Sequence, residues 1–129
     1  MNVVSPEPKT PELVIKPSKI HGLGLFIADD IQQDTVIYES HEYTLTSYPI
    51  YGSLQKTPHE HLLEPFLRWQ NHSCRPNSRL YFSGSNVGLI ALMFIAAGSE
   101  LVCDYRETED YIPVPFRCNC GFCDHIMIE

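Results

Sequence analysis

The heptapeptide Asn-His-Ser-Cys-Arg-Pro-Asn at residues 71–77 is the most informative stretch of this sequence. It places an amide, an imidazole and a thiol close together, so several kinds of polar chemistry meet at one point of the chain. Pro76 fixes its own φ and disfavours the helical region at Arg75, so we predict a shaped loop here. Asn71 and Asn77 can each donate and accept hydrogen bonds, which suits a loop that satisfies backbone groups or holds a polar ligand.

Three further segments stand out along the chain. Residues 21–24 read His-Gly-Leu-Gly, and their glycines permit backbone shapes that other residues disfavour. Residues 97–105 read Ala-Gly-Ser-Glu-Leu-Val-Cys-Asp-Tyr, a turn followed by a short strand pattern. Residues 118–123 read Cys-Asn-Cys-Gly-Phe-Cys, a C-x-C-x2-C cluster of thiols. Each pattern is weak by itself, and the order of all four along the chain carries the information.

In type and order, these segments resemble the motifs of the SET-domain methyltransferase family. The heptapeptide is similar to the NHSC-x-PN signature, residues 18–26 to the G-x-G segment, and residues 97–105 to the G-x-E-L-x-x-D-Y motif. The cysteine cluster is similar to the post-SET tail, with the shorter spacing of the SMYD-type branch. The resemblance covers residues 16–123. It implies a SET-domain (β-clip) fold in which the heptapeptide segment and the segment ending in Tyr105 form a pseudoknot.

Periodicity alone predicts a mostly β chain with one or two short helices. Strand-like runs occur at residues 13–15, 25–28, 35–39, 42–48, 78–83, 87–95 and 100–103. The apolar spacing of residues 59–69 indicates a short helix, whereas residues 49–58 and 106–117 carry the prolines of loops. Combined with the resemblance, this divides the chain into a flexible lead-in at 1–12, a SET domain at 13–112 and a post-SET zinc-binding tail at 113–129.

The charge balance restricts the class of partner. Sixteen acidic residues outnumber nine basic ones, and the formal net charge is −7. A duplex nucleic-acid binder usually presents a basic face, so we expect no direct contact with nucleic acid. The acidity suits a basic partner, such as a lysine-rich peptide drawn in by long-range attraction. The alternative is that the charge only keeps the protein soluble.

Compartment signals in the sequence are mostly negative. No charged segment is followed by an apolar stretch, so we expect no signal peptide. No apolar run approaches about 18 residues, so we expect no membrane span. Five cysteines are an odd number, and their clustering favours reduced, metal-binding thiols in an intracellular protein; a histone substrate would make the protein nuclear. A small core with exposed apolar edges leaves a homodimer open, but no particular patch indicates one.

The resemblance implies S-adenosylmethionine as the cofactor. The residues that match the cofactor site of the family are His21, Gly22, Leu23, Gly24, Asn71 and His72. The first four would bring backbone against the methionine end, and the last two would hold the cofactor by hydrogen bonds. The alternative for the glycines is a tight turn into a strand. For His72 it is a buried, hydrogen-bonded histidine.

Tyr105 matches the catalytic tyrosine of the family, and the alternative is a core or rim aromatic. Methyl transfer needs a neutral amine in line with the methyl group, and free lysine has a pKa of about 10.4. A cationic sulfonium and an apolar channel both disfavour the ammonium form. The residues that we assign to the substrate channel are Tyr38, Cys103, Tyr105, Phe116 and Phe122. For Tyr38, ordinary strand packing is the alternative.

Cys103 departs from the family pattern, because many members carry Phe or Tyr two residues before the catalytic tyrosine. A small thiol leaves room beside the amine and supplies no strong hydrogen bond. We therefore predict that the pocket admits higher methylation states. The alternative, that Cys103 is a small buried hydrophobe, is compatible with this prediction.

Cys118, Cys120 and Cys123 are close enough for a tight loop containing Gly121 to direct three thiolates at one metal ion. A structural zinc ion needs four ligands. In the family, the cysteine of the NHSC motif, here Cys74, joins the zinc of the post-SET tail. The alternative is free thiols in a flexible tail.

Two functions from different classes follow. The first is an S-adenosylmethionine-dependent protein-lysine N-methyltransferase with a structural zinc, acting on a lysine-bearing protein or peptide such as a histone tail. The second is a SET-like protein that does not methylate protein, serving as a cofactor-binding or interaction module or in a small-molecule biosynthetic reaction. Asn71, His72 and Tyr105 favour the enzyme, because a scaffold has no need of all three.

Overall fold

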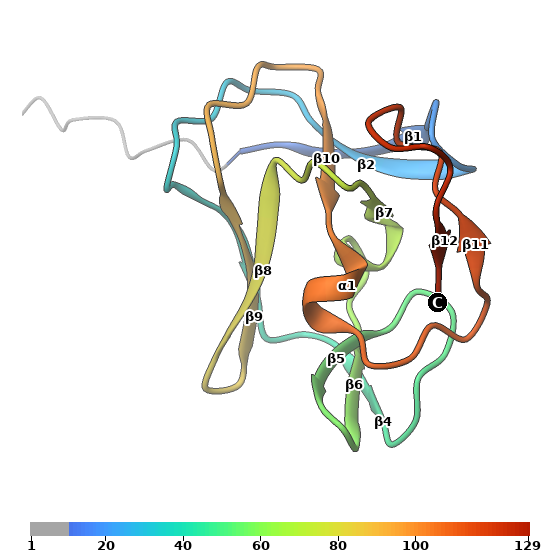
Figure 1. Ribbon diagram of the computed structural model, residues 1–129. Coiled ribbons are helices and arrows are strands. Elements are labelled where there is room, and N and C mark those ends of the chain that lie inside the picture. The colour runs from blue at the N-terminus through green and yellow to red at the C-terminus, as the bar shows by residue number, and fades with distance from the viewer. Residues whose placement is uncertain (1–10) are drawn as a thin grey trace, which may run out of the picture.

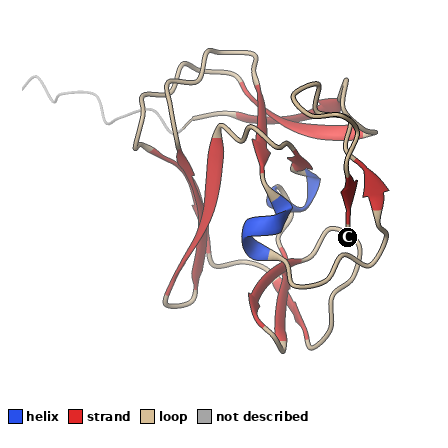
Figure 2. Cartoon of the chain, viewed as in Figure 1, coloured by secondary structure: helices blue, strands red, loops and turns tan. Residues whose placement is uncertain are grey.

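The computed structural model describes residues 11–129, and short β-strands dominate it (Figure 1; Figure 2). The predicted lead-in, residues 1–12, therefore lies outside the described residues except for its last two. Of these, Glu12 is tied to the fold, because its carbonyl accepts the N–H of Ala28 at 2.9 Å. Neither helix in the described chain is long and apolar enough to cross a membrane.

Residues 11–129 form four small sheets. The largest has the strand order β1, β2, β10, β7, with bounds Leu13–Pro17, Leu23–Ile27, Glu100–Cys103 and Asn71–His72. A second sheet consists of β3 (Val36–Ser40), β9 (Asn86–Ala91) and β8 (Ser78–Ser83). A third consists of β4 (Thr44–Thr46), β6 (Glu60–Leu63) and β5 (Leu54–Thr57). The tail forms β11 (Phe116–Arg117) and β12 (Met127–Ile128).

The core follows from the alternation of side chains along the strands. In β2, Leu25 and Ile27 are fully buried, whereas the ring of Phe26 between them lies 4.5 Å from the ammonium of Lys16. Leu25 stands opposite Leu101 of β10, which is also fully buried. The apolar face of the first sheet therefore fixes β10, and β10 leads directly to Tyr105.

The heptapeptide loop is bound to β10, although the two are far apart in sequence. β7 pairs with β10 in parallel, with Asn71 opposite Val102 and His72 opposite Cys103. Asn77 completes the attachment, because its amide donates to the carbonyl of Glu100 at 2.8 Å and accepts the N–H of Val102 at 3.0 Å. The two segments that the resemblance assigns to the pseudoknot thus lie side by side.

The predicted helix over residues 59–69 is wrong. Residues 60–63 form β6, which pairs with β4 and β5, and only Leu67–Trp69 form a 3₁₀ turn, η1. Pro65 prevents a continuous helix, and the carboxylate of Glu64 accepts the N–H of Leu67 at 2.7 Å. Two predicted loops also contain regular structure, namely β5 and the short helix α1, Tyr105–Thr108. The strand predicted at 87–95 ends at Ala91.

Candidate functional site

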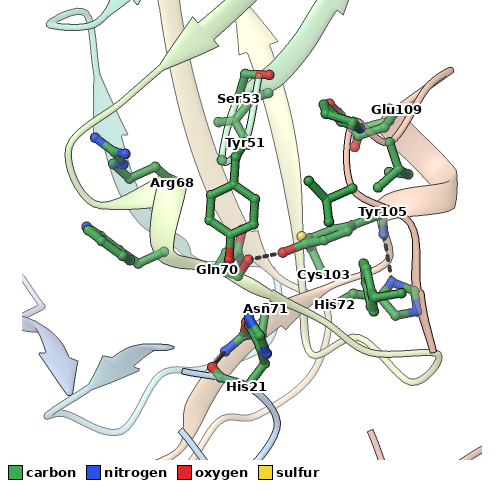
Figure 3. A pocket seen from close by; sticks show the side chains of 18 of the residues that line it. His21, Tyr51, Ser53, Arg68, Gln70, Asn71, His72, Cys103, Tyr105 and Glu109 are labelled. Carbon is green, nitrogen blue, oxygen red and sulfur yellow. Dashed lines mark hydrogen bonds between the residues drawn. The ribbon is translucent and has the colours of Figure 1, made fainter. Parts of the chain in front are cut away.

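A cavity of about 390 Å³ lies where β7, β10, η1 and the tail meet. Segments from the whole chain contribute to its walls, namely residues 20–21, 23, 50–54, 67–72, 80, 103, 105, 108–109, 111–114, 116–117 and 119. The volume falls within the range of about 300–1,000 Å³ that is usual for small-molecule sites. Figure 3 shows the side chains that face this space.

Asn71 supports one wall of the cavity. Its amide nitrogen lies 3.1 Å from the carbonyl oxygens of His21 and Leu23 and 2.9 Å from the carboxylate of Glu100. Ser18 donates to the same carboxylate at 2.8 Å. The amide of Asn71 is therefore used to hold the segment around His21 and Leu23, both of which line the cavity. Figure 3 shows His21 next to Asn71.

The two glycines of this segment are required by its backbone conformation and by close packing. Gly22 has φ +44°, in the left-handed region that favours glycine. A Cβ atom at Gly24 would collide with the carboxylate of Glu100 and lie 3.0 Å from the Cβ of Ser18. Neither glycine is part of the cavity wall. That these glycines contribute to a cofactor site stays a prediction, and they would do so by positioning His21 and Leu23.

His72 connects the cavity to the cysteine cluster. Its Nδ1 accepts the backbone N–H of Tyr105 at 3.0 Å, so in the neutral ring the proton is on Nε2, which lies 3.6 Å from the sulfur of Cys74. Burial lowers the pKa of His72, and the carboxylate of Asp104 at 3.5 Å partly opposes this shift. His72 is thus a neutral, buried, hydrogen-bonded histidine that also lines the cavity.

Tyr105 projects from the start of α1 into the cavity. Its hydroxyl donates to the backbone carbonyl of Gln70 (Figure 3). Its ring packs against His72 and Phe116, with centroids 5.3 and 5.9 Å away. Burial raises the pKa of Tyr105 well above its ordinary value, and Cys103 and Tyr51 add to this electrostatically. At neutral pH the residue is therefore a neutral phenol, suited to orienting a ligand rather than to accepting a proton.

The residues assigned to the substrate channel divide into two groups. Cys103 and Phe116 line the cavity with Tyr105, and burial raises the pKa of the Cys103 thiol, which keeps it protonated. The structure does not bring Tyr38 and Phe122 to the cavity. The hydroxyl of Tyr38 donates to Glu64 at 2.6 Å, and Phe122 is exposed and lies 5.3 Å from the guanidinium of Arg75.

Sequence reasoning missed several residues of the cavity wall. Arg68 contributes an exposed guanidinium, which lies 5.1 Å from the ring of Trp69. Glu109 contributes a half-buried carboxylate that accepts the N–H of Gln55 at 2.9 Å, and burial raises the pKa of Glu109. Arg68 lies just before the heptapeptide, so its position was a usable signal. Glu109 and Tyr51 lie in segments without a recognisable motif, so the sequence offered no signal for them.

The four predicted metal ligands lie together. The sulfur atoms of Cys74, Cys118, Cys120 and Cys123 are all within 4.8 Å of one another. The Cys74–Cys118 and Cys120–Cys123 pairs are 3.7 and 3.8 Å apart. A tetrahedral zinc ion with Zn–S bonds of about 2.3 Å separates its ligand sulfurs by about 3.8 Å, so this donor set fits zinc. The backbone N–H of Phe122 lies 3.4 Å from the Cys120 sulfur, an outer hydrogen bond that suits a thiolate.

Comparison with protein families agrees with this geometry. The SET domain family matches residues 22–106, well over half of the 129 residues. The chain therefore belongs to the SET domain family, which is a methyltransferase family. The match includes the heptapeptide and ends just after Tyr105, and the cysteine cluster beyond it is compatible with a post-SET cluster. A comparison with curated proteins found no matching relative.

Proposed function

We propose that the protein is an S-adenosylmethionine-dependent protein-lysine N-methyltransferase that acts on a lysine-bearing protein or peptide, most simply a histone tail in the nucleus. The observation that carries this proposal is the shared cavity. Tyr105 and the segment that Asn71 holds line this one cavity, within a chain that belongs to the SET domain family. The net charge of −7 supports a basic substrate, because an acidic protein attracts a lysine-rich segment at long range.

The cofactor would supply an electrophilic methyl group on a sulfonium. The backbone around His21 and Leu23, held by Asn71, would contact its methionine end. Arg68 is one of the residues that line the same cavity, so its guanidinium could pair with the carboxylate of the methionine. These groups bind and orient, which is the main requirement of an in-line transfer.

The remaining walls of the cavity would favour the neutral form of the substrate amine and orient it. Leu54, Leu80 and Cys103 are buried around the cavity, and apolar surroundings disfavour a lysine ammonium. Tyr105 stays a neutral phenol whose hydroxyl points at the carbonyl of Gln70. That pair of polar atoms would orient the amine, which loses its proton to solvent before transfer.

The proposal is tested by titrating the protein with S-adenosylmethionine in a calorimeter and assaying methyl transfer to mixed histones by mass spectrometry. Saturable binding together with transfer to lysine supports the proposal. Binding without transfer favours a cofactor-binding module or a small-molecule enzyme. The absence of binding would favour the remaining alternative, an interaction module that uses no cofactor.

Replacing Arg68 by Ala is expected to weaken S-adenosylmethionine binding about fivefold, since an exposed guanidinium contributes a screened charge–carboxylate contact. Calorimetry measures the effect. The matched control is Arg79→Ala, because Arg79 is also exposed but lies outside the cavity wall, with its Nε 3.3 Å from Glu107. Equal affinities for the two variants would remove Arg68 from the cofactor site.

With excess cofactor, the wild-type protein is expected to form di- or trimethyllysine, because Cys103 leaves space beside the amine. Cys103→Phe should shift the product toward monomethyllysine by filling that space. Mass spectrometry of the peptide product measures both results. Calorimetry with the cofactor verifies that the larger side chain has not disrupted the buried site. Strictly monomethyl product from the wild type would contradict this explanation.

A further inference from the structure

Residues 50–53 form a tight turn that brings Tyr51 to the cavity. The N–H of Ser53 donates to the carbonyl of Ile50 at 3.0 Å. The Ser53 hydroxyl donates to that carbonyl at 2.7 Å and accepts the N–H of Ile50 at 3.0 Å. Gly52 has φ +83°, as the third position of a type II turn requires. Tyr51 therefore occupies the second position of a turn that its own hydrogen bonds hold rigid.

The turn is packed against the segment that precedes the heptapeptide. A Cβ atom at Gly52 would lie 3.3 Å from the carbonyl oxygen of Arg68. The backbone of the turn thus lies close to η1, and its position is fixed relative to Gln70. The backbone of Tyr51 therefore has a fixed position at the cavity wall.

The phenol of Tyr51 points toward Gln70 and Tyr105 (Figure 3). The raised pKa of Tyr105 agrees with this proximity, since burial and Cys103 raise it first and Tyr51 adds to them. Within residues 11–129 the Tyr51 hydroxyl has no hydrogen-bond partner, and the residue is 63% exposed. Tyr51 thus offers an aromatic ring and a free hydroxyl on a backbone turn of fixed position, at the edge of an apolar cavity, and both groups are available to a ligand.

We propose that Tyr51 contacts the substrate: its ring forms one wall of the channel for the methylene chain of lysine, and its hydroxyl oxygen accepts an N–H of the amine. This inference rests on the proposed function and adds to it a second phenol, opposite Tyr105. The two hydroxyls differ in their hydrogen bonding, because that of Tyr105 donates to the carbonyl of Gln70 whereas that of Tyr51 has no partner within the described residues.

Steady-state kinetics on a lysine peptide that the wild type methylates separate the two contacts. Tyr51→Leu removes the wall and should raise the KM for the peptide about tenfold. Tyr51→Phe keeps the wall and should lower kcat about fivefold with little change in KM, as expected for one hydrogen bond to the amine. Affinity for S-adenosylmethionine should stay within about twofold of the wild type in both variants.

Tyr48 provides the matched control. It lies in the same connection between β4 and β5 and is 64% exposed, but it is not part of the cavity wall. Tyr48→Leu and Tyr48→Phe should leave kcat, KM and cofactor affinity unchanged. Loss of cofactor affinity in the Tyr51 variants, or kinetics equal to those of the Tyr48 variants, would overturn the proposal.

A measurement without turnover keeps this inference separate from the proposed function. The protein is labelled with 3-fluorotyrosine at its seven tyrosines, saturated with S-adenosylhomocysteine and titrated with n-butylamine, which reproduces the side chain of lysine. The Tyr51→Phe and Tyr48→Phe variants assign the two fluorine signals. A saturable shift at Tyr51 but not at Tyr48 supports the contact, and an unmoved Tyr51 signal contradicts it. If the wild type transfers methyl groups to no lysine peptide, the proposed function fails, and this titration alone decides the role of Tyr51.

Discussion

Tyr105→Phe should lower kcat for lysine methylation about a hundredfold, with cofactor affinity changed little. The hydroxyl is fixed on the carbonyl of Gln70, and the ring is held between His72 and Phe116. Without the hydroxyl, the amine loses a group that orients it, and misplacement of reacting atoms by about 1 Å can cost about 10²-fold in rate. Single-turnover kinetics with saturating cofactor and peptide measure the loss directly.

Tyr43→Phe is the matched control, because the hydroxyl of Tyr43 also donates to a backbone carbonyl, that of Ser85 at 2.7 Å, but away from the cavity. Both substitutions remove one hydrogen bond, so both should lower the free energy of unfolding by about 1 kcal/mol. Only the change at Tyr105 should affect turnover. If the two variants lose activity equally, Tyr105 acts on the fold and has no special role in transfer.

The part of the fold that the sequence predicted best is the part whose partners are local or carried by a motif. The pattern of residues 100–103 predicted β10, which has those bounds, and residues 78–83 predicted β8. The error at residues 59–69 has a physical cause. Leu62, Leu63, Phe66 and Leu67 have a spacing that suits a helix, but Leu62 and Leu63 are paired with β4 and Leu62 also with β5. Tertiary pairing overrode local preference there, and no local pattern reports it.

Side-chain partners at the site were harder to predict than its location. The heptapeptide and Tyr105 identified the cavity, yet the amide of Asn71 is used on the protein's own backbone around His21 and Leu23. Tyr38 occupies a strand, as expected, but its hydroxyl is bound to Glu64 outside the cavity. Such pairings join segments that are distant in sequence, so they depend on the completed fold.

Removal of zinc is expected to abolish activity and to unfold the tail at residues 113–129 in the same step. The four thiols join Cys74, in the heptapeptide loop, to three cysteines of the tail. Just before these three cysteines in the sequence, β11 carries Phe116, whose ring lies 6.0 Å from that of His72. The small apolar cluster of the tail is built around the ligands themselves, because Cys118 is one of its buried members and the other three cysteines pack against it. Site formation and local folding are therefore expected to be one event, as in small zinc domains. Chelation followed by hydrogen exchange and mass spectrometry measures protection in residues 113–129, and metal analysis measures zinc content.

The substitutions that isolate this effect are Cys118→Ser and Cys103→Ala. Cys118 is a buried member of the cluster, whereas Cys103 is a buried thiol outside it. Cys118→Ser should reduce the zinc content and the exchange protection of the tail, because one of four tetrahedral ligands is lost. Cys103→Ala should retain both, since it leaves all four ligands in place. Because Phe116 and Tyr105 share a wall of the cavity, loss of order in the tail reaches the reaction centre directly. A metal-free protein with full turnover and a protected tail would contradict this coupling and leave the thiols without a structural role.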